Sequence, residues 1–112
     1  RIGRNVFRAS KIYDEFKDID IVAVNDLTDT KTLAHMLKYD SVMGRFHCDV
    51  SADDTGIIVD SEHINVSAVK EPAKIPWHDA GVEYVIEATG RFRDAALAQG
   101  HREAGAGKVI IS

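Results

Sequence analysis

The stretch Ile19-Asp20-Ile21-Val22-Ala23-Val24-Asn25-Asp26 decides how the rest of the chain is interpreted. It is a nearly all-apolar, largely β-branched run that stops at an Asn-Asp pair. Side chains of a strand alternate between its two faces, so a run without polar alternation is typical of a strand buried on both. We therefore predict a parallel sheet with helices on both sides of it.

Asp26 lies where this predicted strand ends, and two interpretations of its carboxylate stay open. A carboxylate at the carboxyl end of a parallel strand can accept hydrogen bonds from the hydroxyl groups of a ribose. An Asp after a strand is also a common turn residue or helix N-cap. The strand taken alone favours the turn or cap, so the neighbouring segments have to decide.

Length and composition describe one small globular domain. The chain has 112 residues, 45% hydrophobic and 29% charged, with a formal net charge of −4. The sequence has no Lys/Arg stripe of the kind that binds nucleic acid, and no apolar run approaches the roughly 18 residues that span a membrane. We therefore expect neither a nucleic-acid partner nor a membrane partner. The single cysteine, Cys48, excludes an internal disulfide and fits a reducing cytoplasm.

Hydrophobic periodicity predicts alternating helices and strands. Helical spacing covers residues 1–16, with Arg8 facing outward, then 32–39, a short helix from Trp77, and 94–104. Apolar runs predict strands at 19–26, 82–88 and near the chain end, and polar alternation predicts a three-strand antiparallel meander over 46–69. This order predicts a doubly wound α/β sheet, mostly parallel, with the meander inserted after the second helix.

Three predicted strands end in small or polar residues, at Asn25-Asp26, Ala88-Thr89-Gly90 and Ser112. The carboxyl ends of parallel strands meet at one edge of a sheet, where nucleotides bind. Arg1-Ile2-Gly3 opens the first helix, and a helix N-terminus favours phosphate. A full Gly-x-Gly-x-x-Gly motif is absent, which leaves a nucleotide site and a set of plain turns as equally good interpretations.

Neither a catalytic nor a metal site is predicted. No Cys-His or Ser-His-Asp arrangement emerges from the sequence, and the histidines lack the clustering that metal ligands need. Cys48 falls in the first meander strand, where we expect a half-buried small hydrophobe rather than a reactive thiol.

Several motifs together resemble the phosphorylating glyceraldehyde-3-phosphate dehydrogenase family. They are Arg1-Ile2-Gly3-Arg4, Val24-Asn25-Asp26-Leu27, the segment from Thr32 to Ser41, Ile75-Pro76-Trp77, Glu87-Ala88-Thr89-Gly90 and Lys108-Val109-Ile110-Ile111-Ser112. The resemblance covers essentially the whole chain and concerns the family's N-terminal NAD-binding domain. It implies a Rossmann-type fold whose first, central strand is missing here, so that residues 1–112 form a partial NAD-binding domain without the catalytic domain.

The resemblance also implies a set of NAD-binding residues. Arg1 and Ile2 would lie beside the pyrophosphate, and Asp26 would hold the adenosine ribose. Lys70 stands near the adenine at a position that is usually Arg in the family. Thr89, Gly90, Phe92 and Ser112 would complete the cleft, Phe92 near the adenine and Ser112 towards the nicotinamide half.

The implied enzyme is cytoplasmic and forms a homotetramer. With NAD as cofactor and phosphate as co-substrate, it converts glyceraldehyde 3-phosphate to 1,3-bisphosphoglycerate in glycolysis. Its nucleophilic cysteine and base histidine would follow Ser112, and Cys48 lacks their sequence context, so we expect no catalytic residue in this chain. Two alternatives stay open: an erythrose-4-phosphate dehydrogenase, and a non-enzymatic nucleotide-binding module on the same fold.

Overall fold

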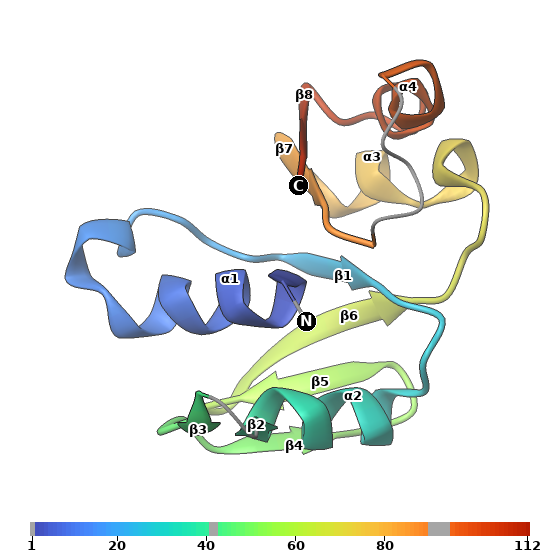
Figure 1. The fold of residues 1–112 in the computed structure, drawn as a ribbon. Helices are drawn as coiled ribbons and strands as arrows, with labels where there is room; N and C mark the ends of the chain where they lie inside the picture. The colour runs from blue at the N-terminus through green and yellow to red at the C-terminus, as the bar shows by residue number, and fades with distance from the viewer. Residues whose placement is uncertain (1, 41–42, 90–94) are drawn as a thin grey trace.

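Helices and strands alternate along the chain in the computed structural model, which describes residues 2–40, 43–89 and 95–112 (Figure 1). The helices are α1 (Ile2–Ile12), α2 (Thr30–Lys38), α3 (Trp77–Ala80) and α4 (Ala95–Glu103), with 3-10 turns η1 (Asp14–Phe16) and η2 (Pro72–Lys74). The strands are β1 (Ala23–Asn25), β2 (Tyr39–Asp40), β3 (Gly44–Arg45), β4 (Val50–Ala52), β5 (Gly56–Val59), β6 (Glu62–Ser67), β7 (Tyr84–Glu87) and β8 (Lys108–Ile111).

The predicted meander is confirmed, but it is not a separate insertion. β4, β5 and β6 pair antiparallel, and β6 also pairs parallel with β1, so that one sheet has the order β1-β6-β5-β4. In the parallel pair Ala23 lies opposite Asn65, and Asn25 lies opposite Ser67. A strand has two hydrogen-bonding edges, and β6 uses one for the meander and the other for β1.

A second parallel pair is formed by β7 and β8, which α4 connects as a β-α-β unit. Val85 lies opposite Val109, and Glu87 lies opposite Ile111. Figure 1 shows this unit together with α3 on one side of β1, and β6, β5 and β4 on the other. The chain is therefore a mixed α/β structure with parallel and antiparallel pairs.

The strand predicted over residues 19–26 is shorter and more exposed than expected. Only Ala23–Asn25 form β1, and Ile19 and Val22 are 57% and 42% exposed. The parallel ladder with β6 begins only at the pair Ala23 and Asn65, and within the described part of the chain β1 is the edge of its sheet, so residues 19–22 pair on neither side. The prediction of a strand buried on both faces is wrong for this segment.

The first helix ends earlier than predicted, and one of its charged residues is buried. α1 stops at Ile12, and a 3-10 turn follows. Arg8, expected to face outward, donates from Nε and Nη2 to the Leu37 carbonyl at 3.0 and 2.8 Å and from Nη2 to the Lys38 carbonyl at 3.1 Å. The last carbonyls of α2 have no partner within their own helix, and Arg8 satisfies them.

Local signals place the other helices as predicted. Asp29 caps α2 through its Oδ1, which accepts from the Thr32 N–H at 2.8 Å. Pro76 precedes the short helix α3, and Gly81 ends it with a left-handed φ of 71°. Among the described residues no helix is both long and apolar enough to cross a membrane.

Two hydrophobic cores lie on either side of β1. The first joins α1, α2 and the four-stranded sheet, and its buried residues are Phe7, Leu33, Ala34, Leu37, Phe46, Cys48, Ile57, Val59 and Ile64. The second lies under α3 and the β7–β8 pair, and its buried residues are Ile75, Trp77, Val85 and Ala106. Val24 packs against the first core and Ala23 against the second, so β1 connects them.

Candidate functional site

Asp26 follows β1 directly, at the carboxyl end of the parallel β1–β6 pair. Its N–H extends the ladder by donating to the Ser67 carbonyl at 2.9 Å, and its Oδ1 accepts from the Thr28 N–H at 2.9 Å. The carboxylate thus closes a small turn, as one interpretation of the sequence expected. Among the described residues Oδ2 has no hydrogen bond, and a carboxylate has enough lone pairs to accept from a diol as well.

Asn25, predicted only as part of a strand end, fixes the neighbouring segment. Its Nδ2 donates to the Val69 carbonyl at 3.0 Å, and its Oδ1 accepts from the Val69 N–H at 3.0 Å and the Ser67 hydroxyl at 2.8 Å. The chain leaving β6 is therefore held beside the end of β1, and the exposed Lys70 follows at once. A half-buried Asn next to a candidate ligand is a weak signal in sequence, because its partners lie over 40 residues away.

The second pair of strand ends belongs to β7 and β8. The N–H and the hydroxyl of Thr89 both donate to Glu87 Oε1, at 3.1 and 2.6 Å. The N–H of Ser112 donates to the Glu87 carbonyl at 2.9 Å. Because Glu87 lies opposite Ile111, Thr89 and Ser112 both follow the same end of this parallel pair, and both are exposed.

The start of α1 approaches the end of β7. A Cβ built on Gly3 would lie 3.6 Å from the Ala88 Cβ, and Ile2 beside it is 54% exposed. The predicted residues Arg1 and Gly90, and Phe92, lie outside the described residues. The helix N-terminus and the β7 strand end therefore meet, which is the arrangement that dinucleotide-binding folds use for a pyrophosphate.

The predicted residues thus gather at two strand-end pairs, Asp26 with Lys70 and Thr89 with Ser112. Two hollows that the described residues form lie elsewhere. One of about 150 Å³ is lined by α1 and the segment around Phe46, and an open one of about 810 Å³ lies between α2 and β4. Neither hollow includes a predicted site residue.

Comparison with known proteins decides what this arrangement belongs to. A family model described as the NAD-binding domain of glyceraldehyde 3-phosphate dehydrogenase matches residues 1–95. The chain belongs to this glyceraldehyde-3-phosphate dehydrogenase family. The resemblance seen in the sequence is confirmed, and NAD is the cofactor of the matched domain.

Relatives with the name glyceraldehyde-3-phosphate dehydrogenase cover the whole chain. That of Mycobacterium tuberculosis (strain H37Rv) is 53% identical over 117 residues, and that of Thermotoga maritima is 53% identical over 113 residues. Glyceraldehyde-3-phosphate dehydrogenase 1 of Bacillus cereus is 51% identical over 112 residues. The chain spans about a third of the length of these relatives, with 33%, 34% and 33% covered in Bacillus, Mycobacterium and Thermotoga.

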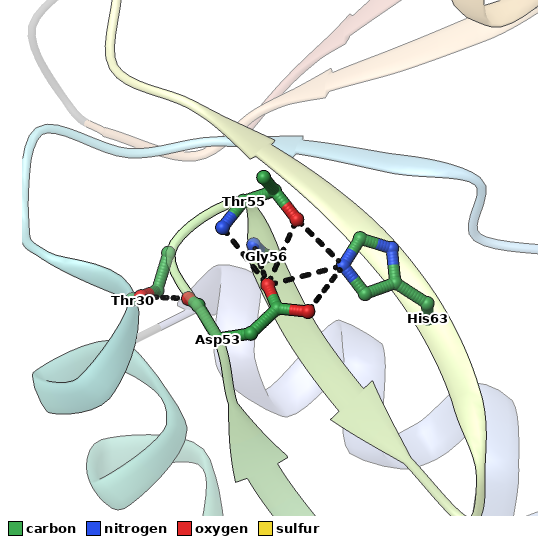
Figure 2. Close-up of polar contacts among 5 residues, drawn as sticks. All are labelled: Thr30, Asp53, Thr55, Gly56 and His63. Carbon is green, nitrogen blue, oxygen red and sulfur yellow. Dashed lines mark hydrogen bonds and ion pairs between the residues drawn. The ribbon is translucent and has the colours of Figure 1, made fainter.

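Two further features of this NAD-binding domain, a side-chain cluster and a cysteine, could suggest catalysis, and neither is a catalytic arrangement. Figure 2 shows Thr55, His63 and Asp53 together, which at first resembles a nucleophile-base-acid set. The Thr55 hydroxyl and both Asp53 oxygens contact the same ring nitrogen, His63 Nε2, at 3.0 to 3.2 Å. A relay needs the hydroxyl and the carboxylate on opposite ring nitrogens, so this cluster stabilises a turn instead.

Cys48 is also unsuited to act as a nucleophile. It is 2% exposed, and its burial, with a hydrogen bond to Asp60, raises the pKa of the thiol to about 11. A thiol that stays protonated at neutral pH is a poor nucleophile. Among the described residues no group of three or more His, Cys, Asp or Glu side chains is placed to hold a metal ion.

Proposed function

We propose that this chain is the NAD-binding part of a phosphorylating glyceraldehyde-3-phosphate dehydrogenase of the cytoplasm. The whole protein would oxidise and phosphorylate glyceraldehyde 3-phosphate to 1,3-bisphosphoglycerate in glycolysis. The observation that carries the proposal is identity of 51% to 53% with enzymes of that name along the entire chain. Those names favour glyceraldehyde 3-phosphate over erythrose 4-phosphate as the substrate, and an enzyme over a non-enzymatic module.

The cofactor-binding residues of the proposal are those at the two strand-end pairs and at the start of α1. They are Arg1, Ile2, Asp26, Lys70, Thr89, Gly90 and Ser112. The half-buried Asp26 carboxylate fits a ribose diol, and the approach of Gly3 to Ala88 fits a pyrophosphate that needs backbone N–H groups. When bound, NAD supplies the hydride acceptor of the reaction.

We further infer that residues 1–112 are part of a doubly wound NAD-binding domain within a homotetrameric enzyme. The catalytic residues would lie in another part of the protein. The buried, protonated Cys48 supports this division, because the reaction needs a thiolate. The parallel pairs β1–β6 and β7–β8 support the doubly wound sheet, since helices connect parallel strands in such folds.

The Asp26→Asn substitution in the intact protein tests the proposal. The amide keeps an Oδ1 acceptor for the Thr28 N–H. It loses the second carboxylate oxygen, which accepts from the ribose diol, and the negative charge, which repels a 2′-phosphate. We expect the ratio of kcat/KM for NAD to that for NADP, with glyceraldehyde 3-phosphate and phosphate, to fall about tenfold or more, which is at least about 1.4 kcal/mol.

Asp20→Asn is the matched control, because Asp20 is exposed on the approach to β1. It removes the same charge and should leave the NAD to NADP ratio unchanged. A wild-type protein that prefers NADP would contradict the role of Asp26. A wild-type protein that binds NAD but turns over neither aldehyde phosphate would contradict the enzyme.

A further inference from the structure

Trp77, His101 and Glu87 form a hydrogen-bonded chain that is closed to water. They come from α3, α4 and β7, and their exposed fractions are 6%, 4% and 5%. The Trp77 indole N–H donates to His101 Nδ1 at 3.0 Å, and His101 Nε2 lies 2.5 Å from Glu87 Oε2. A buried His-Glu contact is costly to assemble unless each polar atom has a partner, and here each has one.

The indole gives this chain a single direction. An indole N–H can only donate, so His101 Nδ1 must accept and carries no proton. The neutral imidazole then bears its proton on Nε2, which donates to Glu87 Oε2. One arrangement of protons satisfies all three side chains, and the reverse arrangement would set two N–H groups against each other.

Thr89 completes the chain from the other side. Glu87 Oε1 accepts from the Thr89 N–H at 3.1 Å and from its hydroxyl at 2.6 Å. Burial raises the pKa of Glu87, but the hydrogen bonds from Thr89 and His101 outweigh burial and leave the pKa below its usual value. Glu87 is therefore an ionised acceptor for both partners, and the single hydroxyl proton of Thr89 is committed to it.

We propose that Glu87 is a positioning residue of the cofactor site, which holds Thr89 at the end of β7 while Trp77 and His101 lock the carboxylate in place. The inference rests on the proposed function, in which Thr89 lines the NAD cleft. The Thr89 hydroxyl can then accept from a ligand but has no proton to donate to one. A phosphate oxygen, which only accepts, gains nothing from it, whereas a ribose hydroxyl or an amino group can donate to it.

Replacing the carboxylate with an amide breaks this chain at one end. In Glu87→Gln the amide oxygen can accept from Thr89, but the amide N–H₂ then faces the Nε2–H of His101. If the amide turns over, the oxygen serves His101 and the N–H₂ faces the Thr89 N–H. Because the indole of Trp77 fixes the imidazole proton, either orientation leaves two donors opposed.

The experiment measures Kd for NAD and Tm of the intact protein for wild type, Glu87→Gln, Trp77→Phe and the double variant. We expect Glu87→Gln to raise Kd about tenfold, which corresponds to about one hydrogen bond. Phe at position 77 lets His101 carry its proton on Nδ1. In the double variant the amide nitrogen can then donate to His101 Nε2, and the amide oxygen can accept from Thr89. The Kd of the double variant should return to within about threefold of Trp77→Phe, while its Tm stays low because the buried Nδ1–H is unpaired.

A second pair of variants applies if Glu87→Gln does not fold. In His101→Gln the amide oxygen can accept from Trp77 and the amide nitrogen can donate to Glu87, so the direction of the chain is kept. His101→Leu removes both contacts. We expect Kd for NAD to stay within about threefold of wild type for Gln and to rise about tenfold for Leu.

Glu83→Gln is the matched control, because Glu83 is exposed just before the same strand, and it should change neither Kd nor Tm. A Glu87→Gln protein with lower Tm but unchanged Kd would overturn the inference and leave a structural role only. If Glu87→Gln raised Kd for NAD by the same factor in wild type and in Trp77→Phe, the inference would also be overturned. If Asp26→Asn weakens NAD binding and the Glu87 and His101 variants do not, the inference fails while the proposed function stands. A wild-type protein that binds no NAD overturns both the inference and the proposed function.

Discussion

Asp53 shows how one exposed carboxylate organises a whole turn at the scale of a residue. Its Oδ1 accepts from the N–H groups of Thr55 and Gly56 at 2.8 and 2.9 Å and from the Thr55 hydroxyl at 2.8 Å. His63 on β6 closes the cluster, and the Asp53 carbonyl accepts from the Thr30 hydroxyl at 2.6 Å (Figure 2). Hydrogen bonds from Thr55, then from His63, lower the pKa of Asp53 from its ordinary 3.8 to about 2.

This shift predicts a specific loss of stability in acid. Because the folded-state pKa lies below the ordinary one, the contribution of Asp53 is fully present above pH 3.8 and is lost as the pH falls through about 2. We expect Asp53→Asn to be less stable than wild type at pH 6, and the gap in the free energy of unfolding to narrow steadily below pH 3.8. Urea denaturation of both proteins from pH 6 to 2 measures this difference in the free energy of unfolding.

The exposed neighbour Asp54 supplies the control for this titration. Asp54→Asn should track wild type through the whole pH range. A gap between Asp53→Asn and wild type that stays constant down to pH 2 would show that the carboxylate charge is not what stabilises the turn.

Which residues carry the candidate site was only partly predictable at this scale. Asp26 could be found, because a polar residue at the end of an apolar run is a local pattern. The roles of Asn25 and Glu87 could not. Asn25 bonds to Val69, 44 residues away, and Glu87 bonds to His101, 14 residues away, and no local pattern contains such partners.

At the scale of elements, the meander is where sequence pattern and structure agree best. Its turns and alternation are local features, and the strands β4, β5 and β6 follow them closely. Gly56 at the start of β5 adds a condition that the pattern does not show. A Cβ at this position would collide with the Ile64 carbonyl oxygen and lie 3.1 Å from the Asn65 Cα, both backbone atoms of the adjacent strand.

We therefore expect Gly56→Ala to destabilise the protein by about 1–3 kcal/mol, since backbone atoms of β6 must move to admit the methyl group. Chemical denaturation measures the change. Gly3→Ala serves as the control, because a Cβ there meets only the Ala88 Cβ at an ordinary 3.6 Å and Ala favours the helix. A Gly56→Ala protein as stable as wild type would mean that β5 and β6 can separate without cost.

The errors at this scale have a common origin. Helical spacing assigned Arg8 to the outer face, and a β-branched run extended the first strand back to Ile19. Arg8 turned inward because the final carbonyls of α2 lie against α1 and need donors. Residues 19–22 remained outside the strand because a strand forms only where a neighbour pairs with it.

For the whole molecule, the division into two cores predicts which parts unfold locally and lose amide protection together. The four-stranded sheet and the β7–β8 unit each have their own buried cluster, and β1 contributes Val24 to one and Ala23 to the other. Segments with separate cores can lose protection independently. The proposed cofactor residues are distributed over both units, Asp26 and Lys70 on one and Thr89 and Ser112 on the other.

Leu37→Ala tests this division by hydrogen exchange. Leu37 is 3% exposed in the first core, and the truncation should cost about 2–5 kcal/mol. We expect amide protection to fall in β4, β5 and β6 and to change much less in β7 and β8. Val85→Ala, which truncates the second core, should give the opposite pattern, and equal loss in both units from either variant would show one cooperative body instead.

By itself, the sequence determined the element types, the meander and the family, because periodicity and motif residues are properties of short segments. Only the tertiary structure decided that β6 joins the meander to β1, that Arg8 is buried, and that Glu87 connects Thr89 to His101 and Trp77. These depend on which distant groups meet when the chain closes, and a buried polar group is satisfied only by the partner that folding brings to it. For Ile19 to Asp26, the sequence marked the strand and its terminal carboxylate, and the fold decided that only Ala23–Asn25 pair.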